Sequence, residues 1–465
     1  MSQSTTGHVV NGHNSSVNGV SHVEKFNIED IPELKIPPRV LMGAGPSASY
    51  PEALRAMSST TLGHLDPEFL AIMGNVGAML RRVFKTQNPI TGAVPTTGTG
   101  GMEAALCNLI EPGDEVLCVV YGYFSNRMKQ MAERMGAVVS VVEGPWGTVV
   151  PIEKVKEALD KIKNPKLVTV VHAETSTGIL HPVQEIVKLA HERGALAVVD
   201  TVTSLGGCPV YVDDWECDAV FSGTQKCIGA PPGLSPITFN ARAMDRIRNR
   251  KVPVQSWYLD MSLVETYWGD SSAGGRAYHY TAPSNALFGL HEALRMTLLE
   301  GVENRWARHE MHSRAFTAGT EVLGLLPYAQ EGHRLWQLAT MYIPEGIDDL
   351  AVRTRLLREY NIEISAGLGS AKGKIWRVGI MGYSANRSNI FLLLGALETI
   401  LGDMGHNLEK GAASEAANAI YHEYDNKKTS SSEAPIALEV DEEDAPPIGE
   451  AIPAESVAQG VAHRD

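Results

Sequence analysis

The sequence predicts an α/β fold with a mainly parallel sheet, followed by a smaller α+β region. Three observations lead to this prediction. Short valine-rich runs alternate with amphipathic helical patterns, the runs are continuously apolar, and the order of elements changes after about Gly301. Continuous apolar runs are typical of strands buried on both faces, as in parallel sheets covered by helices.

The elements of the α/β region follow from these two patterns. Runs such as VLCVVY and LVTVVH are short, rich in β-branched residues and apolar throughout, which favours strands. We expect strands at 116–121, 138–142, 167–172, 195–199, 219–222 and 235–239. Helical patterns occupy 102–110, 124–135, 152–162 and 182–193.

The second region mixes longer helices with isolated strands. Its expected elements are a helix at 305–322, a strand at 336–343, a helix at 348–359, strands at 361–365 and 374–380, and a helix at 386–402. We therefore predict a large domain at 37–300 and a small domain at 301–408, flanked by tails at 1–36 and 409–465.

Both tails are expected to be disordered. The first is rich in Ser, Asn, Gly and His and has no aromatic residue before Phe26, so it offers too little apolar surface to offset the entropy of ordering. The second contains serine and proline runs and many acidic residues. The net charge of the whole chain is −14, and residues 429–465 carry nine acidic residues against one arginine. More than half of the charge therefore belongs to the second tail.

Composition excludes several functions. An acidic protein repels a phosphate backbone, so we expect no nucleic-acid partner. No apolar run approaches the roughly 18 residues of a membrane helix, and residues 1–23 do not resemble a signal peptide. The five cysteines include no CxxC pair, which favours reduced thiols. We expect a cytoplasmic protein without a membrane partner.

Four segments that follow predicted strands or precede helices hold unusual residues. Asp200 directly follows the apolar run ALAVV, and Lys226 lies among small and turn residues in SGTQKCIGAPPG. The segments 97–101 (TGTGG) and 175–178 (TSTG) offer hydroxyls and, for the first, the amides of a helix start. Each has a plain alternative when taken alone: a helix cap or salt bridge for Asp200, an exposed loop lysine for Lys226, and ordinary turns for the other two.

The combination of the four segments predicts a pyridoxal 5'-phosphate site. The phosphate of this cofactor needs an anion cradle, and its aldehyde needs a desolvated lysine that can form a Schiff base. Its phenolic oxygen needs a hydroxyl donor, and its ring nitrogen needs a carboxylate to stay protonated. Because parallel strands present their carboxyl ends at one edge, these groups are expected to meet there.

Residues from about 38 to 405 resemble the alanine:glyoxylate and serine:pyruvate aminotransferase family, which are class V aminotransferases of pyridoxal phosphate fold type I, the aspartate aminotransferase-like fold. The segments that carry the resemblance are GAGPS at 43–47, GH at 63–64, TGTGGMEAAL at 97–106, EPGDEVL at 111–117, ETSTG at 174–178, VDTVTSLGG at 199–207, SGTQKCIGAPPG at 222–233, YLD at 258–260, YHYTAP at 278–283 and GLGSAKGKIWRVGIMGYSA at 367–385.

The resemblance implies a role for each matching residue around the cofactor ring. Lys226 would bind the aldehyde and move the proton of the substrate Cα, and Asp200 would pair with the ring nitrogen. Val202 and Phe124 would pack on the two ring faces, and Thr175 would reach the phenolic oxygen. The family often has Trp where this chain has Phe124. Phenylalanine keeps the stacking on the ring but lacks the N–H donor of the indole.

The resemblance also implies a shared active site in a homodimer. The phosphate would be held by Thr99, Gly100, Gly101 and Gln225 of one subunit and by Tyr278 and Thr281 of the other. Arg377 would bind the substrate carboxylate as a two-pronged fork, and Gly45 and Ala48 would line a small substrate pocket. Relatives often carry a polar residue at the position of Ala48.

The sequence thus predicts a transaminase that moves an amino group from alanine or serine to glyoxylate or pyruvate by a ping-pong mechanism. The alternatives are another class V enzyme, such as a lyase or a pyridoxamine:pyruvate transaminase, and a non-catalytic interaction protein on the same fold. A cysteine desulfurase needs a mobile cysteine well after the lysine, and none follows Cys227. The run HEMH at 309–312 is interpreted as a solvated helix face, and no metal is assigned.

Overall fold

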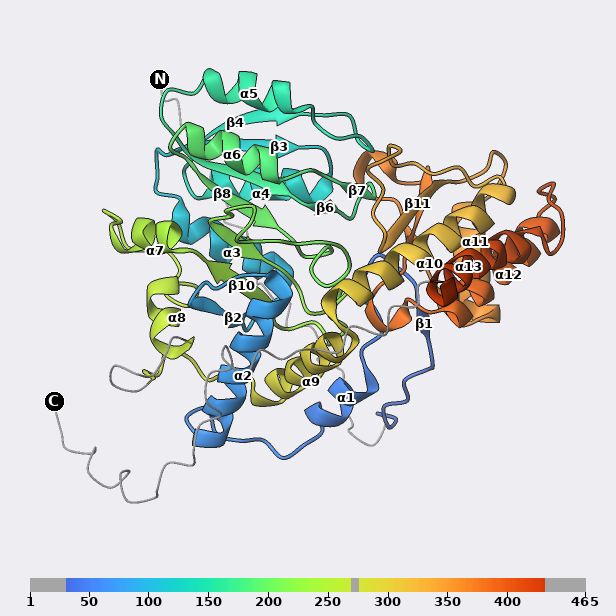
Figure 1. Cartoon of the computed structure of the whole chain (residues 1–465), viewed down its shortest axis with the longest axis horizontal. Coiled ribbons are helices and arrows are strands. Elements are labelled where there is room, and N and C mark those ends of the chain that lie inside the picture. Colours follow the sequence, from blue (N-terminus) through green and yellow to red (C-terminus); the bar gives the residue numbers. More distant parts are fainter. Residues whose placement is uncertain (1–30, 269–275, 431–465) are drawn as a thin grey trace, which may run out of the picture. The chain divides into compact units, whose positions relative to one another are not determined.

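The computed structural model describes residues 31–268 and 276–430. The chain divides into two parts, residues 1–38 and 39–465, and all elements below belong to the second part (Figure 1). Of the predicted tails at 1–36 and 409–465, residues 1–30 and 431–465 lie outside the described residues. The elements in chain order are β1 (Val40–Leu41), α1 (Pro51–Met57), α2 (Pro67–Phe84), β2 (Ile90–Val94), α3 (Gly98–Leu109), β3 (Glu115–Val120), α4 (Tyr123–Arg134), β4 (Val138–Glu143), α5 (Ile152–Asp160), β5 (Pro165–Val171), β6 (Ala173–Glu174), β7 (Ile179–Leu180), α6 (Gln184–Glu192), β8 (Leu196–Asp200), β9 (Ala219–Phe221), β10 (Ser235–Phe239), α7 (Ala241–Arg248), α8 (Met261–Trp268), α9 (Ser284–Glu300), α10 (Val302–Val322), β11 (Leu338–Tyr342), α11 (Asp349–Glu359), β12 (Ile362–Glu363), β13 (Ser365–Ala366), η3 (Gly369–Ala371), β14 (Ile375–Gly379), η4 (Gly382–Ser384), α12 (Arg387–Asp403) and α13 (Ala412–Ser430).

A seven-stranded sheet forms the centre of the α/β region. Its strand order is β2-β10-β9-β8-β5-β3-β4, and only β10 runs antiparallel to its neighbours. The central strands β8 and β9 are almost entirely buried, because helices pack against the sheet. The predicted α/β fold with a mainly parallel sheet is therefore confirmed, and the valine runs form its interior.

The register of the central strands brings three loops to the same edge of the sheet. Val171 of β5 pairs with Asp200 of β8, and Asp200 pairs with Phe221 of β9. The chain segments that leave these strands therefore start side by side at the carboxyl edge. They carry the residues that the sequence predicts for catalysis.

A second hydrophobic cluster lies around the sheet β11-β14-β13 and the helices α10 and α12. It includes the fully buried Trp376 and Phe316, and it also includes Met42 from the beginning of the chain. Met42 reaches this cluster because β1 pairs in parallel with β12. Residues 40–42 thus pack with the second cluster, whereas the sequence prediction assigns them to the large domain. The boundary between the large and the small domain at residues 300 and 301 stays a prediction.

The predicted disorder of residues 409–465 is wrong for its first part. Residues 412–430 form α13, which packs along α10 and α12 (Figure 1). Ala413, Ala417 and Tyr421 recur every fourth residue and are buried in the second cluster. Two of these three residues are alanines, whose small side chains give a weak apolar signal. The stripe is stable because α10 and α12 supply most of the surface that it buries.

The interpretation of residues 309–312 as a solvated helix face is also wrong. His309 is fully buried in α10 and His312 is almost so. His309 Nε2 accepts a hydrogen bond of 3.0 Å from the Gly382 amide, and the His312 Nδ1 lies 2.8 Å from the Tyr421 hydroxyl. These partners come from segments that are distant in sequence, which is why the local pattern does not show them.

Residues 31–268 and 276–430 contain neither a membrane-spanning helix nor a cluster of metal ligands. None of the helices in these ranges is both long enough and apolar enough to cross a bilayer. No group of three or more His, Cys, Asp or Glu side chains in these ranges is placed to hold a metal ion.

Candidate active site

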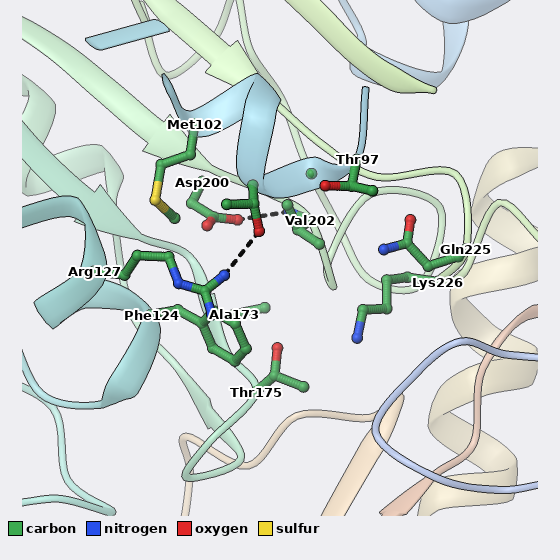
Figure 2. A pocket seen from close by; sticks show the side chains of 12 residues that line it. Thr97, Met102, Phe124, Arg127, Ala173, Thr175, Asp200, Val202, Gln225 and Lys226 are labelled. Atoms are coloured by element: carbon green, nitrogen blue, oxygen red, sulfur yellow. Dashed lines mark hydrogen bonds between the residues drawn. The ribbon is translucent and has the colours of Figure 1, made fainter. Parts of the chain in front are cut away.

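The carboxyl edge of the sheet and the first turns of α3 and α4 surround a pocket of about 510 Å³, a volume that includes space open to solvent (Figure 2). The lining residues are Thr97, Gly98, Thr99, Met102, Phe124, Arg127, Ala173, Thr175, Asp200, Val202, Gln225 and Lys226.

Lys226 follows β9 and is 8% exposed. Its ammonium group donates a hydrogen bond to the Ala44 carbonyl. Burial and, to a smaller extent, the positive charge of Arg377 lower the pKa of Lys226 to about 8, although Cys227 and Asp200 oppose the shift. A lysine with this pKa has a substantial neutral fraction near neutral pH, and the neutral amine is the nucleophile.

Asp200 ends β8 and is 3% exposed. Its Oδ1 accepts a hydrogen bond of 2.7 Å from the Val202 amide. Burial raises the pKa of Asp200 to about 7, with a contribution from Glu174, whereas the Val202 amide, Arg127 and Lys226 lower it. Figure 2 shows Asp200 and Lys226 reaching the same pocket from different segments. A buried carboxyl group of this kind is stabilised in its charged form by a cationic ligand.

The first turn of α3 presents backbone amides at the pocket. Thr97 caps the helix without a side-chain hydrogen bond, and Thr97, Gly98 and Thr99 line the pocket. The structure differs from the predicted phosphate cradle at the last glycines. The Gly101 amide donates to the Thr97 carbonyl and is therefore used within the helix. Gly100 and Gly101 are not lining residues. A Cβ on Gly101 would lie 1.9 Å from Ser235 Oγ, so this glycine allows α3 to approach the sheet.

Phe124 and Arg127 lie one turn apart on α4 and both face the pocket (Figure 2). The Arg127 guanidinium lies 4.9 Å from the centre of the Phe124 ring and donates a 2.8 Å hydrogen bond to Thr99 Oγ1. The sequence prediction includes Phe124 and Thr99 but not Arg127. A cationic residue three positions after a stacking aromatic in a predicted helix is the signal that would have found it.

Glu174 is a second residue that the sequence prediction did not select. It is fully buried beneath the first turn of α4, where it accepts hydrogen bonds from the amides of Phe124 (3.2 Å) and Ser125 (2.9 Å) and from Ser176 Oγ (2.6 Å). A carboxylate at a helix N-terminus stabilises the helix. Glu174 therefore fixes the place of the Phe124 ring.

Arg377 lies on β14 and is 7% exposed. Its Nε donates to the Ala366 carbonyl at 2.8 Å and its Nη1 to the Thr175 carbonyl at 3.1 Å. Burial lowers the pKa of Arg377 to about 10, and Glu174 opposes this shift. The group is still cationic at neutral pH. Thr175 itself lines the pocket, and its hydroxyl pairs with that of Thr203 at 2.7 Å.

The segment that contains Gly45 and Ala48 lies beside Lys226. Gly45 has a φ of 110°, and a Cβ at this position would lie 2.2 Å from Lys226 Nζ, so only glycine fits. The Ala48 amide donates to Ser384 Oγ at 3.3 Å. Gln225 lines the pocket, and its side-chain oxygen is buried with no hydrogen-bond partner within the described residues. That oxygen is a polar group available to a ligand.

Tyr278 and Thr281 are not among the residues that line this pocket. Both are exposed, Tyr278 to 58%, and their hydroxyl oxygens lie 3.4 Å apart. Within one chain they do not join the other predicted cofactor residues.

The buried Lys226 and Asp200 line one pocket at the carboxyl edge of the parallel sheet. Arg377 does not line this pocket, but it reaches the same edge from β14 through its hydrogen bond to the Thr175 carbonyl. A buried lysine and a buried carboxyl group in one pocket are typical of enzymes that act on amines and carbonyl compounds.

Comparison with known proteins identifies the family. The chain matches the family model described as "Aminotransferase class-V" over residues 44–387, and it belongs to this family. It is 39% identical over 407 residues to the (S)-ureidoglycine–glyoxylate transaminase of Bacillus subtilis, covering 84% of this chain and 97% of the relative. It is 38% identical over 366 residues to the alanine–glyoxylate aminotransferase of Drosophila melanogaster, covering 78% and 92%.

Solved structures agree with this assignment. The crystal structure of alanine–glyoxylate aminotransferase from Nostoc sp. matches with a TM-score of 0.77 and 44% identity, covering 80% of this chain and 97% of that one. The family predicted from sequence is thus confirmed, and the chain is an aminotransferase. Its α/β fold is the one predicted, fold type I.

Proposed function

We propose that this aminotransferase uses pyridoxal 5'-phosphate and transfers an amino group from a small amino acid to glyoxylate or pyruvate. The observation that carries the proposal is the pair formed by Lys226 and Asp200, two buried titratable groups that reach one pocket from neighbouring strand ends. The two relatives named above act on glyoxylate according to their names, which supports glyoxylate as the acceptor.

The pocket residues fit this cofactor. The helix start at Gly98 and Thr99 offers amides and a hydroxyl for the phosphate, and Arg127, bonded to Thr99, adds a positive charge. Gln225 lines the same pocket, and its side-chain NH2 group would donate a hydrogen bond to the phosphate. Phe124 and Val202 provide two apolar surfaces for a flat ring. Asp200 would accept a hydrogen bond from the protonated ring nitrogen.

The bound cofactor would supply an electron sink for the electrons released from the substrate Cα–H bond. Lys226 Nζ would remove the Cα proton and later return a proton, which requires a neutral amine with a pKa near the working pH. Asp200 would stay ionised against the ring nitrogen, because the cationic N–H offsets the cost of its burial. Thr175, which lines the pocket, would offer its hydroxyl to the phenolic oxygen, and the Thr203 hydroxyl is paired with that of Thr175 at 2.7 Å.

Arg377 and Gly45 support a small substrate with a carboxylate. Two of the five N–H donors of Arg377 are used by the Ala366 and Thr175 carbonyls, and among the described residues none takes its Nη2, which would donate to a carboxylate oxygen. Gly45 brings its backbone close to Lys226 and leaves little room for a long side chain. We propose alanine, serine or ureidoglycine as donors; the third is suggested by the Bacillus relative.

The exposed pair Tyr278 and Thr281 supports a homodimer with shared sites. We propose that these residues complete the phosphate site of the other subunit, as the family resemblance implies. Their exposure in the single chain leaves both hydroxyls accessible to such a partner.

The cysteines do not support a desulfurase. All five, at 107, 118, 208, 217 and 227, are buried, and burial raises the pKa of Cys227, which lies next to the catalytic lysine, to about 11. A nucleophilic cysteine is accessible and has a lowered pKa. Five free thiols fit a reducing compartment, and the cytoplasm is the proposed location.

The proposal is tested by steady-state assays of the holoenzyme. Each of L-alanine, L-serine, (S)-ureidoglycine and pyridoxamine is paired with glyoxylate and with pyruvate. We expect parallel double-reciprocal lines, which indicate a ping-pong mechanism, and the highest kcat/KM for a small amino acid with glyoxylate. Lys226→Ala should lose measurable turnover with every pair. Turnover by Lys226→Ala at the wild-type rate would refute the proposal.

A further inference from the structure

Arg305 on α10 is fully buried although it is not one of the pocket-lining residues. Its guanidinium uses all three nitrogens. Nε donates to the Gly206 carbonyl at 2.9 Å, Nη1 donates to the Tyr50 hydroxyl at 2.5 Å, and Nη2 donates to the Cys227 carbonyl. Nη1 also donates to Glu300 Oε2 at 2.8 Å.

The acceptors of Arg305 belong to the segments that carry the site. Cys227 directly follows Lys226, and Gly206 lies on the segment that begins at Asp200. Tyr50 follows the segment with Gly45. One planar and rigid group therefore connects the backbone next to the lysine with the backbone that follows the carboxylate.

The Glu300 carboxylate holds this arginine in place. Its two oxygens also accept hydrogen bonds from Arg308, at 2.5 Å from Nε and 3.0 Å from Nη2. Burial alone would raise the pKa of Glu300, but hydrogen bonds from Arg308 and the charge of Arg305 outweigh it, so the net pKa is lowered. Glu300 is therefore ionised at neutral pH.

Arg308 extends the same arrangement to the segment after Arg377. It donates to the carbonyls of Gly382 at 3.1 Å and Ala385 at 2.5 Å. The first two turns of α10 thus contact the backbone segments of Asp200, Lys226 and Arg377.

We propose that Arg305, held by Glu300, is a positioning residue that fixes Lys226 relative to Asp200. The inference rests on the proposed function for the role of Lys226. Without the guanidinium, two buried carbonyl groups would lose their donors and the two segments would relax toward other partners. A shift of about 1 Å at reacting groups is enough to lower a rate about 100-fold.

Arg305→Lys tests the proposal, because lysine keeps the charge but cannot reach the three acceptors as a fork. The first readout uses cofactor-free protein, in which Lys226 is modified by an amine-reactive reagent at a series of pH values and located by mass spectrometry. A loosened segment lets water reach Lys226, so we expect the pH midpoint to rise from about 8 toward 10.5. In the holoenzyme we expect kcat to fall about 100-fold, with KM changed less than about threefold, because Arg377 is retained.

Matched controls separate positioning from general stability. Phe316 lies on the same helix and belongs to the second cluster. Phe316→Leu should lower Tm without moving the pH midpoint of Lys226 modification. Glu300→Gln should shift the midpoint in the same direction as Arg305→Lys, whereas Glu303→Gln, whose partner is Lys85 at the surface, should not. If Arg305→Lys does not fold, Glu300→Gln decides the question by the same measurement.

A folded variant with the wild-type midpoint and kcat would overturn the proposal. The two hypotheses fail in different ways. If the wild-type protein does not bind pyridoxal phosphate at Lys226, the proposed function is wrong, while the modification of cofactor-free protein still reports on positioning.

Discussion

At the scale of single residues, burial determines the protonation of the two central groups. The pKa of Lys226 is lowered to about 8 and that of Asp200 is raised to about 7, each mainly by burial. The lysine is thereby made nucleophilic near neutral pH. The ionised form of Asp200 is unfavourable until a cation binds to it. This lowers the folding stability of the protein without cofactor.

The pKa of Lys226 predicts how fast the cofactor-free protein captures pyridoxal phosphate. We expect the capture rate to rise about tenfold per pH unit below pH 8 and to level off above it, because only the neutral amine reacts. Stopped-flow absorbance measures this rate. N-acetyl-lysine methyl amide serves as the solvated control, and a protein midpoint near 10.5, the ordinary lysine value, would contradict the account.

The burial of Asp200 predicts that Asp200→Asn stabilises the cofactor-free protein. The carboxyl group ionises near pH 3.8 when unfolded and near 7 when folded. The folded state therefore holds its proton more tightly, and wild-type stability falls as the pH rises from 3.8 to 7. Relative to wild type, the variant should gain on the order of 3 to 4 kcal/mol at pH 8 and much less at pH 4.5.

Urea denaturation at the two pH values measures this difference. Asp214→Asn, at an exposed position, is the control and should change stability by less than about 0.5 kcal/mol. The same Asp200→Asn variant should bind pyridoxal phosphate more weakly. If the variant is less stable than wild type at pH 8, the buried Asp200 carboxylate does not lower the folding stability of the protein.

At the scale of elements, α13 is joined to the rest of the protein by a buried aromatic residue. Tyr421 is 1% exposed, and its hydroxyl is the hydrogen-bond partner of His312 on α10. Burial lowers the pKa of His312 to about 3, so the imidazole is neutral at physiological pH. The Tyr421 hydroxyl is therefore the hydrogen-bond partner of a neutral, buried imidazole.

Tyr421→Phe should lower the free energy of unfolding by about 1 to 3 kcal/mol, because it leaves His312 Nδ1 buried without its partner. Tyr424→Phe is the matched control. Tyr424 lies on the same helix and its hydroxyl contacts Arg314 near the surface at 3.2 Å, so its loss should cost less than about 0.5 kcal/mol. Thermal denaturation compares the two variants, and equal effects would contradict the role given to Tyr421.

The elements also show which features a sequence can predict. Six strands of the seven-stranded sheet were predicted to within two residues, because runs such as ALAVV before Asp200 are apolar throughout and sharply bounded. The fully buried β2 was not predicted. The helix α13 was not predicted, because its buried stripe consists of Ala413, Ala417 and Tyr421 and is buried only by packing against other helices, mainly α10. The family motifs predicted Lys226 and Asp200. Glu174 and Arg305 make their contacts with distant segments, which no local pattern contains, whereas the spacing of Phe124 and Arg127 on α4 is a local signal for Arg127.

At the scale of the whole molecule, the proposed dimer predicts complementation between two inactive variants. One subunit carries Lys226→Ala and the other carries Tyr278→Ala with Thr281→Ala. If Tyr278 and Thr281 act in the other subunit, a mixed dimer regains one complete site, and random pairing restores about a quarter of all sites. Activity after refolding the mixture measures this. No recovery beyond the sum of the separate variants would contradict the shared site.

The central claim is that Lys226 holds pyridoxal phosphate in an aminotransferase. The most direct measurement is reduction of the reconstituted full-length protein with borohydride, followed by peptide mass spectrometry. We expect the cofactor mass on the peptide that contains Lys226. Prior addition of excess L-alanine without an acceptor should remove the modification, because the cofactor then carries the amino group and is no longer bound to the lysine. A modification on another lysine, or none in protein that has been saturated with cofactor, would contradict the account.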